Sequence, residues 1–515
     1  MIGEVPELTG AILAGLTAEG FRVRQVVPGR TVRRLGAERY EVDLSSPEAL
    51  RELHRLLAGT DGTPVGGLFN ALGLCPPFCG PDGDNPAAAL HIAAWTFHLV
   101  KEFADDMQAS AAEGGGWFIS LTALGGQFGL DGHPVSSVAA AGTLGISKTL
   151  QREHPRLRVR CIDIDPALPA DLLSARLMQE LLEATDDAPE IGLTREGRWR
   201  PALKLALPPR ELSPLSLPEG AVILVTGGAH GVTADVARSL AACARPRLIL
   251  AGRSPLPQPE PPLTRGLDPA ALRKKLLEEA RRCGEAVRPA EIERTVRRIL
   301  KFRQIQANLD ALRTTGATVE YLALDVRDTE QFGRLLDDLY ERFGRIDGVI
   351  HGAGVIDDKR IADKTPASFA EVFRTKVDSA YTLARKLRPE VLKFLVFFGS
   401  VSGRFGNVGQ VDYSAANEVL NKLADQLARR WPARVVCINW GPWDGGMVSP
   451  ELRTVYAAKG IDLIPVEEGV LAFHNELRLP SSTEVVISCS VEHMLPIDGG
   501  QGVILDPHTA SRART

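Results

Sequence analysis

Short apolar runs alternate with amphipathic stretches along most of this chain. The runs have the length and composition of strands buried on both faces, and the stretches carry apolar residues three and four positions apart, as helices do. Strands that alternate with helices build parallel sheets, so the pattern predicts an α/β protein with doubly wound parallel sheets. In the second half, the expected strands are 220–228, 247–254, 319–326, 347–354, 393–398 and 433–443, and helices are expected up to about 243 and at 329–343, 367–387 and 413–430.

The first half follows the same plan. Its expected strands are 21–27, 38–44, 66–74 and 158–164, and its expected helices are 7–19, 47–58, 86–112 and 135–153. The letters also repeat between the halves, since GGQFG at 125–129 matches SGRFG at 402–406. The repeat predicts two Rossmann-like subdomains, each with its own sheet.

Two boundaries divide the chain into three parts. The proline-rich stretch 207–220 has the composition of a linker. We therefore expect a structural subdomain over 1–212, a catalytic subdomain over 213–485, and a linker or tail over 486–515. A helical insertion, 255–318, interrupts the catalytic subdomain between its second and third strands.

The insertion opens with the letters PLPQPEPPL and continues into two helical patterns, near 268–283 and 289–315. Apolar residues in the second pattern form a stripe that would pack on the domain. Residues 271–305 carry eleven lysines and arginines against five acidic residues. Two interpretations stay open: a basic arm that docks an acidic carrier protein, and a solvated helical hairpin that only braces the domain.

Candidate chemistry gathers after the apolar run 393–398. Ser400 follows this strand, and Tyr413 and Asn417 lie four positions apart, hence on one face of the next expected helix. A hydroxyl at a strand end that faces a phenol at a helix start has the geometry for proton transfer. In the register of the repeat, the counterparts of these residues are Ala123, Ser136 and Ala140. None of the three recurs, so the first half is interpreted as a degenerate, structural copy.

A glycine-rich loop lies where the first strand of the second half turns into a helix, in VILVTGGAHGVT (222–233). Its glycines, Gly227, Gly228 and Gly231, would let the backbone approach a pyrophosphate, whose charge a helix N-terminus favours. Arg253 ends the second strand, where an arginine accommodates the 2′-phosphate of NADPH and an acidic residue favours NAD. The loop and this arginine together predict an NADPH site.

The ends of later strands would complete this site. Asp325 and Val326 end the third strand, beside the expected adenine, and the glycines of 352–354 would let the cofactor pass close to the backbone. Lys376, on the expected helix before the strand at 393–398, would join the hydroxyl, phenol and amide at the same edge of the sheet.

Composition narrows the class of protein. The size, 515 residues, suits several domains, and the formal charge of −4 predicts no general affinity for nucleic acid or anionic membranes. No apolar run has the length of a spanning helix, and no signal peptide is visible. Sparse cysteines suit a reducing cytoplasm, and the closest pair, Cys75 and Cys79, has no second pair of ligands beside it, so no metal site is expected.

Together the motifs resemble the short-chain dehydrogenase/reductase superfamily and, more narrowly, the ketoreductase region of a type I polyketide synthase. The matching letters are TGGAHGVT, LAGRS, LDVRD, HGAGVIDD, TKVDSAYTL, GSVSG, YSAAN and NWGPW, and the resemblance covers roughly residues 1–485. The loop and the insertion look most like those of polyunsaturated-fatty-acid synthases. The resemblance implies an NADPH-dependent reduction of a β-ketoacyl thioester, carried by an acyl carrier protein, to a β-hydroxyacyl thioester.

The resemblance also implies roles for single residues. Tyr413 would give a proton to the developing alkoxide, and Ser400 would hydrogen-bond the carbonyl oxygen. Lys376 would favour the phenolate form of the tyrosine, and Asn417 would complete a relay through water. The implied cofactor-binding residues are Thr226, Gly227, Gly228, His230, Gly231, Val232, Arg253, Ser254, Asp325, Val326, Gly352, Ala353, Gly354, Lys376, Tyr413 and Pro442. Those implied in substrate binding and stereocontrol are Ile356, Asp357, Asp358, Gln410, Trp443 and Met447.

Two segments would shape the product. The letters IDD at 356–358 resemble the Leu-Asp-Asp motif of relatives that give the (R)-3-hydroxy, or B-type, product, although a polar loop without that role is the alternative. Residues 444–466 are the expected mobile lid over the substrate. Trp440 and Trp443, just before this lid, would serve either the substrate site or core packing.

Three functions stay open. The first is an acyl-carrier-dependent ketoreductase, either free-standing or part of a longer synthase. The second is a reductase or dehydrogenase of free small carbonyl compounds, whose ordinary relatives have only the catalytic subdomain. The third is a non-enzymatic Rossmann-type scaffold, which would require a broken set of catalytic residues, whereas the set is intact in the second half.

Overall fold

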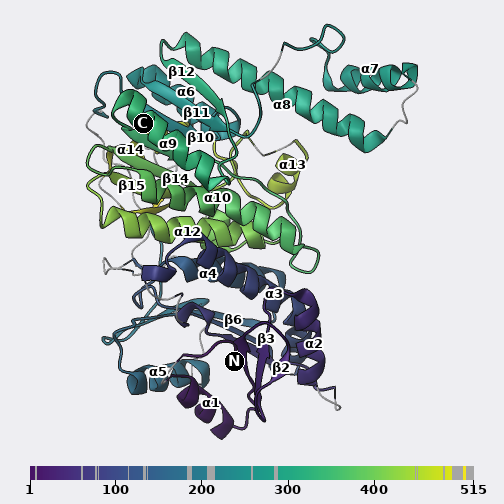
Figure 1. Cartoon of the computed structure of the whole chain (residues 1–515), viewed down its shortest axis with the longest axis vertical. Coiled ribbons are helices and arrows are strands. Elements are labelled where there is room, and N and C mark those ends of the chain that lie inside the picture. Colours follow the sequence, from purple (N-terminus) through teal and green to yellow (C-terminus); the bar gives the residue numbers. More distant parts are fainter. Residues whose placement is uncertain are drawn as a thin grey trace.

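The computed structural model shows two α/β bodies stacked end to end, one for each half of the chain (Figure 1). Helices of both halves lie between the two sheets. In the described part of the chain, no helix combines the length and the apolar character needed to cross a membrane. The structure describes residues 1–5, 8–58, 62–75, 78, 81–113, 115–130, 135, 137–182, 188–205, 215–256, 259–283, 288–446, 448, 450–479, 482–489 and 503–505.

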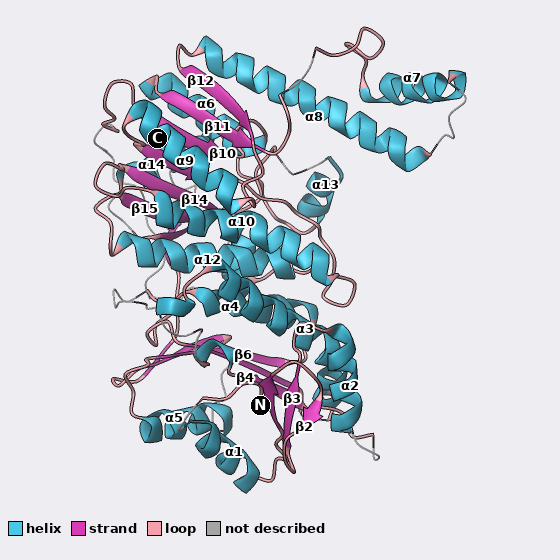
Figure 2. Ribbon diagram, in the orientation of Figure 1, coloured by secondary structure: helices cyan, strands magenta, loops and turns pink. Residues whose placement is uncertain are grey.

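One parallel sheet frames the second half. Its strands, as described, are β9 (Lys204–Leu205), β10 (Val222–Thr226), β11 (Arg247–Gly252), β12 (Thr318–Ala323), β13 (Gly348–His351), β14 (Phe394–Ser400), β15 (Arg434–Trp440), β16 (Glu484–Ile487) and β17 (Val503–Leu505). They pair in parallel in the order β12-β11-β10-β13-β14-β15-β16-β17-β9 (Figure 2). The chain order reverses between β10 and β13, and such a reversal opens a crevice beyond the carboxyl ends of the strands. The short strands β9 and β17 extend the sheet past the expected boundaries, since they lie within 1–212 and 486–515.

Helices cover both faces of this sheet, because alternate residues of each strand point to opposite faces. The helices of this half are α6 (Gly231–Ala244), α7 (Pro269–Arg282), α8 (Pro289–Thr314), α9 (Thr329–Phe343), α10 (Pro366–Lys386), α11 (Val401–Phe405), α12 (Val411–Ala428), α13 (Pro450–Ala458) and α14 (Val466–Arg478). On β14, Leu395 and Phe397 pack in the core with α9, α10 and α12. Phe394 and Val396 pack in the opposite core with α6, α8 and α14. Both cores therefore hold the same strand ends in place.

The first half repeats this plan with a divided sheet. Its elements are α1 (Leu8–Ala18), β1 (Gln25–Pro28), β2 (Arg33–Arg34), β3 (Arg39–Val42), α2 (Pro47–Ala58), β4 (Gly67–Asn70), α3 (Pro86–Ala111), β5 (Trp117–Thr122), α4 (Gly142–Glu153), β6 (Arg158–Ile164), α5 (Ala170–Leu182), β7 (Glu190–Leu193) and β8 (Arg198–Trp199), with short 3₁₀ helices at Leu72–Leu74, Pro81–Gly83 and Ala139–Ala141. The described strands form the sheets β1-β3-β2 and β4-β5-β6-β7-β8, which bridges from Ile2 to Val26 and Asn70 connect. The predicted α/β fold class is confirmed.

One expected strand of the first half ends early. The pattern predicts a strand over 66–74, whereas β4 stops at Asn70. The side-chain oxygen of Asn70 accepts a hydrogen bond from the Leu72 N–H at 3.2 Å, and this local bond turns the chain into a 3₁₀ helix.

The two halves pack through helices, with α4 on α12 and α3 on α10. The contact is close because a glycine lies in it: a Cβ on Gly145 would lie 2.4 Å from the backbone of Ser414, the residue after Tyr413. A buried ion pair between Lys148 and Glu418 also joins the halves. The first half therefore supports the helix that carries Tyr413.

Candidate active site

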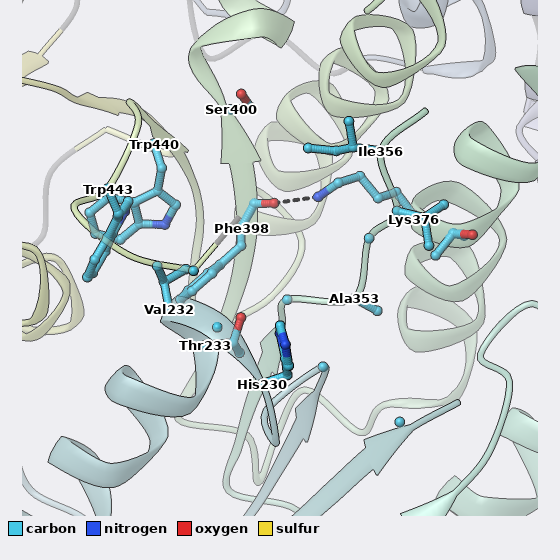
Figure 3. Close-up of a pocket in the computed structure, with 18 of the residues that line it drawn as sticks. His230, Val232, Thr233, Ala353, Ile356, Lys376, Phe398, Ser400, Trp440 and Trp443 are labelled. Atoms are coloured by element: carbon cyan, nitrogen blue, oxygen red, sulfur yellow. Dashed lines mark hydrogen bonds between the residues drawn. The ribbon is translucent and has the colours of Figure 1, made fainter. Parts of the chain in front are cut away.

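A cavity of about 690 Å³ lies at the carboxyl ends of the strands, where the chain order reverses (Figure 3). Its walls come from the loop after β10, from the ends of β11 to β15, and from α6, α8, α10, α11, α12 and α13. The expected residues that line it are Gly227, His230, Gly231, Val232, Arg253, Ser254, Asp325, Val326, Gly352, Ala353, Gly354, Ile356, Lys376, Ser400, Gln410, Tyr413, Pro442 and Trp443. Among the described residues, those expected at the site that do not line the cavity are Thr226, Gly228, Asp357, Asp358 and Asn417. Met447 lies outside the described residues.

The loop after β10 has the form of a phosphate-binding turn. Gly227 and Gly231 have φ angles of 75° and 63°, which side chains rarely adopt. A Cβ on Gly227 would also lie 2.9 Å from the carbonyl oxygen of Gly352. Helix α6 begins at Gly231, so the loop brings the free N–H groups of a helix start to the cavity.

Thr226 supports this loop from behind the wall. Its hydroxyl donates to Nδ1 of His351 at 2.7 Å and accepts from the N–H of Ala353 at 3.2 Å. Burial, assisted by the nearby Lys376 ammonium, lowers the pKa of His351 to about 3, so the ring is neutral. Nε2 of this ring donates to the carbonyl oxygen of Lys376 at 3.0 Å. Thr226 therefore positions the 352–354 segment and α10, and it does not line the cavity.

The ends of β11 and β12 form the wall where an adenosine was expected. Nη1 of Arg253 lies 3.3 Å from a carboxylate oxygen of Glu371. Asp325 pairs with Arg327 at 2.7 Å, and hydrogen bonds from that guanidinium hold the pKa of the Asp325 carboxyl below its usual range. The Arg253 side chain stays 51% exposed, so it is free to turn toward an anion in the cavity.

Three elements bring the expected catalytic side chains together, since Ser400 ends β14, Lys376 lies on α10 and Tyr413 lies on α12. Nζ of Lys376 donates to the carbonyl oxygen of Phe398 at 2.7 Å (Figure 3) and lies 5.3 Å from the centre of the Tyr413 ring. The amide group of Asn417 donates to the Tyr413 carbonyl oxygen at 2.7 Å, one turn back along the helix. Its side-chain oxygen is buried and has no hydrogen-bond partner among the described residues.

Burial controls the protonation of this group. It raises the pKa of the Tyr413 phenol to about 12 and lowers the pKa of the Lys376 ammonium to about 8. Burial therefore outweighs the Lys376 ammonium in setting the pKa of the phenol, and the role of Lys376 in favouring the phenolate stays a prediction. The reason is geometric, because the ammonium points at the Phe398 carbonyl and lies beside the phenol ring, and desolvation of the phenol dominates. At neutral pH the tyrosine is a protonated donor.

The Ser400 hydroxyl is held by its own chain. As the N-cap of α11, its oxygen accepts from the N–H of Ser402 at 3.2 Å and from the Ser402 hydroxyl at 3.0 Å. Because both bonds end on the oxygen, the Ser400 proton is left to donate into the cavity.

Residues 221–445 match the family model of the KR domain, where KR stands for ketoreductase. We refer to these residues as the KR domain. A curated relative, which belongs to the polyunsaturated fatty acid synthase of Thraustochytrium sp., is 28% identical over 478 residues, which cover 89% of this chain and 16% of the relative. Polyketide synthase PksN of Bacillus subtilis is 26% identical over 365 residues, which cover 68% of this chain and 6% of the relative. The resemblance seen in the sequence is confirmed, and the chain spans a small part of these relatives.

Solved structures share the fold of the KR domain and its companion half. The N-terminal ketoreductase from the macrolactin assembly line has a TM-score of 0.66 at 19% identity, covering 94% of this chain and 85% of that one. An A-type ketoreductase from a modular polyketide synthase has a TM-score of 0.68 at 22% identity, and the match covers 94% of this chain and 87% of that one. The match extends over both halves, so the two-body architecture is shared.

The 356–358 loop of the KR domain places one residue in the cavity. Ile356 lines the wall, whereas Asp357 bonds to the Lys359 ammonium at 2.9 Å, away from it. Asp358 accepts from the Gln410 amide at 3.1 Å, and Gln410 lines the cavity at the start of α12. The two aspartates thus fix the loop and the side chain of Gln410.

A buried lysine connects this loop to α12, the helix that carries Tyr413. Nζ of Lys364 lies 2.7 Å from a carboxylate oxygen of Asp412, the residue before Tyr413, and also donates to the Asp357 carbonyl oxygen. The exposed fractions of the Lys364 and Asp412 side chains are 0% and 2%, so solvent does not weaken the pair.

Replacing Lys364 with methionine is expected to lower the free energy of unfolding by about 3–5 kcal/mol, because it leaves Asp412 buried without its partner. Chemical denaturation measures this change in the free energy of unfolding. The matched control is Lys359→Met, whose pair with Asp357 is 44% exposed on each side and contributes at most about 1 kcal/mol. The double variant with Asp412→Asn should regain part of the loss. Equal effects of the two lysine substitutions would contradict the role of the buried pair.

The tryptophans before the expected lid serve both packing and the cavity. The rings of Trp440 and Trp443 pack edge to face with their centres 4.9 Å apart, and both side chains line the cavity (Figure 3). Trp443 is nevertheless buried against Gly469 of α14. Beyond it, Gly446 and Tyr456 also line the cavity, so the described part of 444–466 does border the KR site.

The sequence analysis did not predict that the insertion lines the cavity. Five lining residues lie on α8 of the insertion, namely Arg297, Leu300, Lys301, Gln304 and Ile305. Ile305 belongs to the apolar stripe that the pattern shows, so its helical neighbours were bound to lie near the same surface. The pattern does not say which part of the KR domain that surface is.

Proposed function

We propose that the KR domain reduces a β-ketoacyl thioester to the β-hydroxyacyl thioester, with NADPH as its cofactor and an acyl carrier protein as the carrier of the substrate. The observation that carries the proposal is the convergence of Ser400, Lys376 and Tyr413 in a cavity that the glycine-rich loop and Arg253 also line. The names of the curated relatives support a role in polyketide or polyunsaturated fatty acid biosynthesis.

The cavity fits a phosphate-bearing dinucleotide. Glycines lie where the backbone must come close to the cofactor. A Cβ on Gly227 would meet Gly352, and a Cβ on Gly354 would lie 3.1 Å from Cε of Lys376. The loop from Gly227 to Val232 would hold the pyrophosphate, and Arg253 and Ser254 would hold the 2′-phosphate. Asp325 and Val326 would lie beside the adenine. When bound, NADPH supplies the hydride.

The side chains of the KR domain would handle the carbonyl oxygen. Ser400 donates its free proton to this oxygen, which stabilises the negative charge that develops there. Tyr413 then gives its phenolic proton to the same oxygen, as a general acid. The Lys376 ammonium favours the anion that the tyrosine becomes. The unpartnered oxygen of buried Asn417 is a site for the water that would return the proton.

The substrate would be oriented by the 356–358 loop and the lid. Ile356, Gln410 and Trp443 line the same cavity as Ser400 and Tyr413, and Asp357 and Asp358 fix the loop. We propose the (R)-3-hydroxy product, on the resemblance of this loop to the Leu-Asp-Asp motif. Met447 stays a candidate from the sequence.

The test of this function uses the intact chain with a β-ketoacyl thioester of a short thiol, and follows the loss of NADPH absorbance. We expect turnover with NADPH, much slower turnover with NADH, and an (R)-3-hydroxy product by chiral chromatography. A ketone of the same acyl length without the thioester should react more slowly. Equal turnover of that ketone would favour a reductase of free carbonyl compounds, and an (S) product would refute the stereochemical part.

A further inference from the structure

Helix α8 of the insertion is a fixed wall of the cofactor cavity. It lies along the second body in Figure 1, and α7 extends beyond it. Ile305, Leu309 and Leu312 are buried in the core that α8 shares with α6 and β11. The side-chain amide of Asn308 donates to the carbonyl oxygen of Ala229, in the glycine-rich loop, at 3.0 Å. The part of α8 that reaches the cavity is therefore anchored to the loop itself.

The side of α8 that lines the cavity is positively charged. Arg297, Lys301 and Gln304 follow one another at four and three positions, so they share one helix face, and all three line the cavity. The next cation along the helix, Arg303, is occupied elsewhere, because it pairs with Glu260 of the preceding loop at 2.8 Å. Of the two α8 cations that line the cavity, Lys301 is closer in sequence to the buried anchor than Arg297 is.

Lys301 and Arg253 approach the same end of the cavity from two different elements. Burial and the Arg253 guanidinium both lower the pKa of Lys301, and burial and the Lys301 ammonium lower the pKa of His230. Within the described residues, no carboxylate lies in ion-pair range of Lys301. Arg253 shares Glu371 with Arg327, each at 3.3 Å. This end of the cavity therefore has more positive than negative charge, as an anion site does.

We propose that Lys301 is a second cation for the 2′-phosphate of NADPH, so that the insertion helix α8 completes the cofactor site and sharpens the choice of NADPH over NADH. This rests on the proposed use of NADPH. A phosphate monoester accepts several charge-assisted hydrogen bonds, and a guanidinium from β11 with an ammonium from α8 would enclose it from two sides. Arg297, one turn earlier, extends the positive rim. The insertion then has a catalytic-site function beyond bracing the domain.

The experiment measures binding, separately from turnover. The intact chain is titrated by calorimetry with adenosine 2′,5′-bisphosphate and with adenosine 5′-phosphate, which differ only in the 2′-phosphate. We expect Lys301→Ala to lower the affinity for the bisphosphate by about 10-fold, the scale of one charge-assisted hydrogen bond, and to leave the affinity for the monophosphate unchanged. Lys301→Arg should retain most of the affinity. The matched control is Arg298→Ala, which removes an exposed cation of α8 that does not line the cavity.

Each other outcome has a separate meaning. An equal loss for both nucleotides on Lys301→Ala would assign Lys301 to the 5′-phosphate and would overturn the inference. No loss, or an equal loss in Arg298→Ala, would overturn it as well. If the unmodified chain binds both nucleotides equally, the proposed NADPH preference fails together with it. If Arg253→Ala lowers the affinity for the bisphosphate but not for the monophosphate, and Lys301→Ala does not, the NADPH proposal stands and only the inference about α8 fails. Thermal unfolding of each variant checks that the fold is intact.

Discussion

Replacing Tyr413 with phenylalanine is expected to lower kcat for reduction of the β-ketoacyl thioester by at least ~100-fold, the usual scale of general-acid catalysis. The substitution removes only the hydroxyl, and the ring keeps its place beside Lys376 in the wall of the cavity. Burial raises the pKa of this phenol to about 12, so it carries its proton at neutral pH and is able to give it away. Single-turnover measurement with saturating NADPH reports the loss directly.

The control removes a different phenolic hydroxyl from the same chain. Tyr340 lies on α9, and its hydroxyl accepts from the N–H of Arg388 at 2.9 Å, away from the cavity wall. Tyr340→Phe should leave kcat unchanged. In Tyr413→Phe, the affinity for adenosine 2′,5′-bisphosphate should be retained, which separates loss of chemistry from loss of cofactor binding. Turnover by Tyr413→Phe at the unmodified rate would refute the mechanism.

The doubly wound plan was readable from the sequence because buried parallel strands are continuous apolar runs. The expected strand 393–398 is β14, Phe394–Ser400, and the expected helix 413–430 is α12, Val411–Ala428. The short strands β9 and β17 were not predicted, because two- and three-residue strands leave no periodic pattern. They form on tertiary contacts, since β17 pairs with the open edge of β16 and β9 pairs in turn with β17.

The candidate site, too, was predicted only where its features depend on local sequence. The pairing of Tyr413 with Asn417 follows from helix geometry alone, and the hydrogen bond between them is local. Contacts between distant segments left no such signal, and neither Lys301 beside Arg253 nor Lys364 on Asp412 was predicted. The raised pKa of the Tyr413 phenol also left no signal in the sequence, because it depends on how deeply the fold buries the phenol.

Replacing Lys376 with methionine is expected to lower kcat/KM for reduction by about 100-fold at neutral pH, because the positive charge beside the tyrosinate is lost as the proton leaves. The pH profile gives the sharper result. Burial lowers the pKa of Lys376 to about 8, so the ammonium is present below that pH and is lost as the pH rises through it. In the unmodified chain, kcat/KM should therefore fall above about pH 8, whereas the methionine variant should show no fall there.

Lys376→Met should also stabilise the fold, and this effect distinguishes Lys376 from a lysine that serves only the structure. In the unfolded chain Lys376 keeps its ordinary pKa of 10.5, so between about pH 8 and 10.5 the unfolded state holds a proton that the folded state does not. Folding thus carries the full cost of the buried charge below pH 8, and that cost shrinks as the pH rises toward 10.5. The gain in Tm of Lys376→Met should therefore be largest below pH 8 and decline above it. Lys386→Met, on the same helix with a 42% exposed side chain paired to Asp337, should change neither the pH profile nor the Tm appreciably. If Lys376→Met keeps the basic fall in kcat/KM, another group carries that titration and Lys376 is not the charge that assists Tyr413.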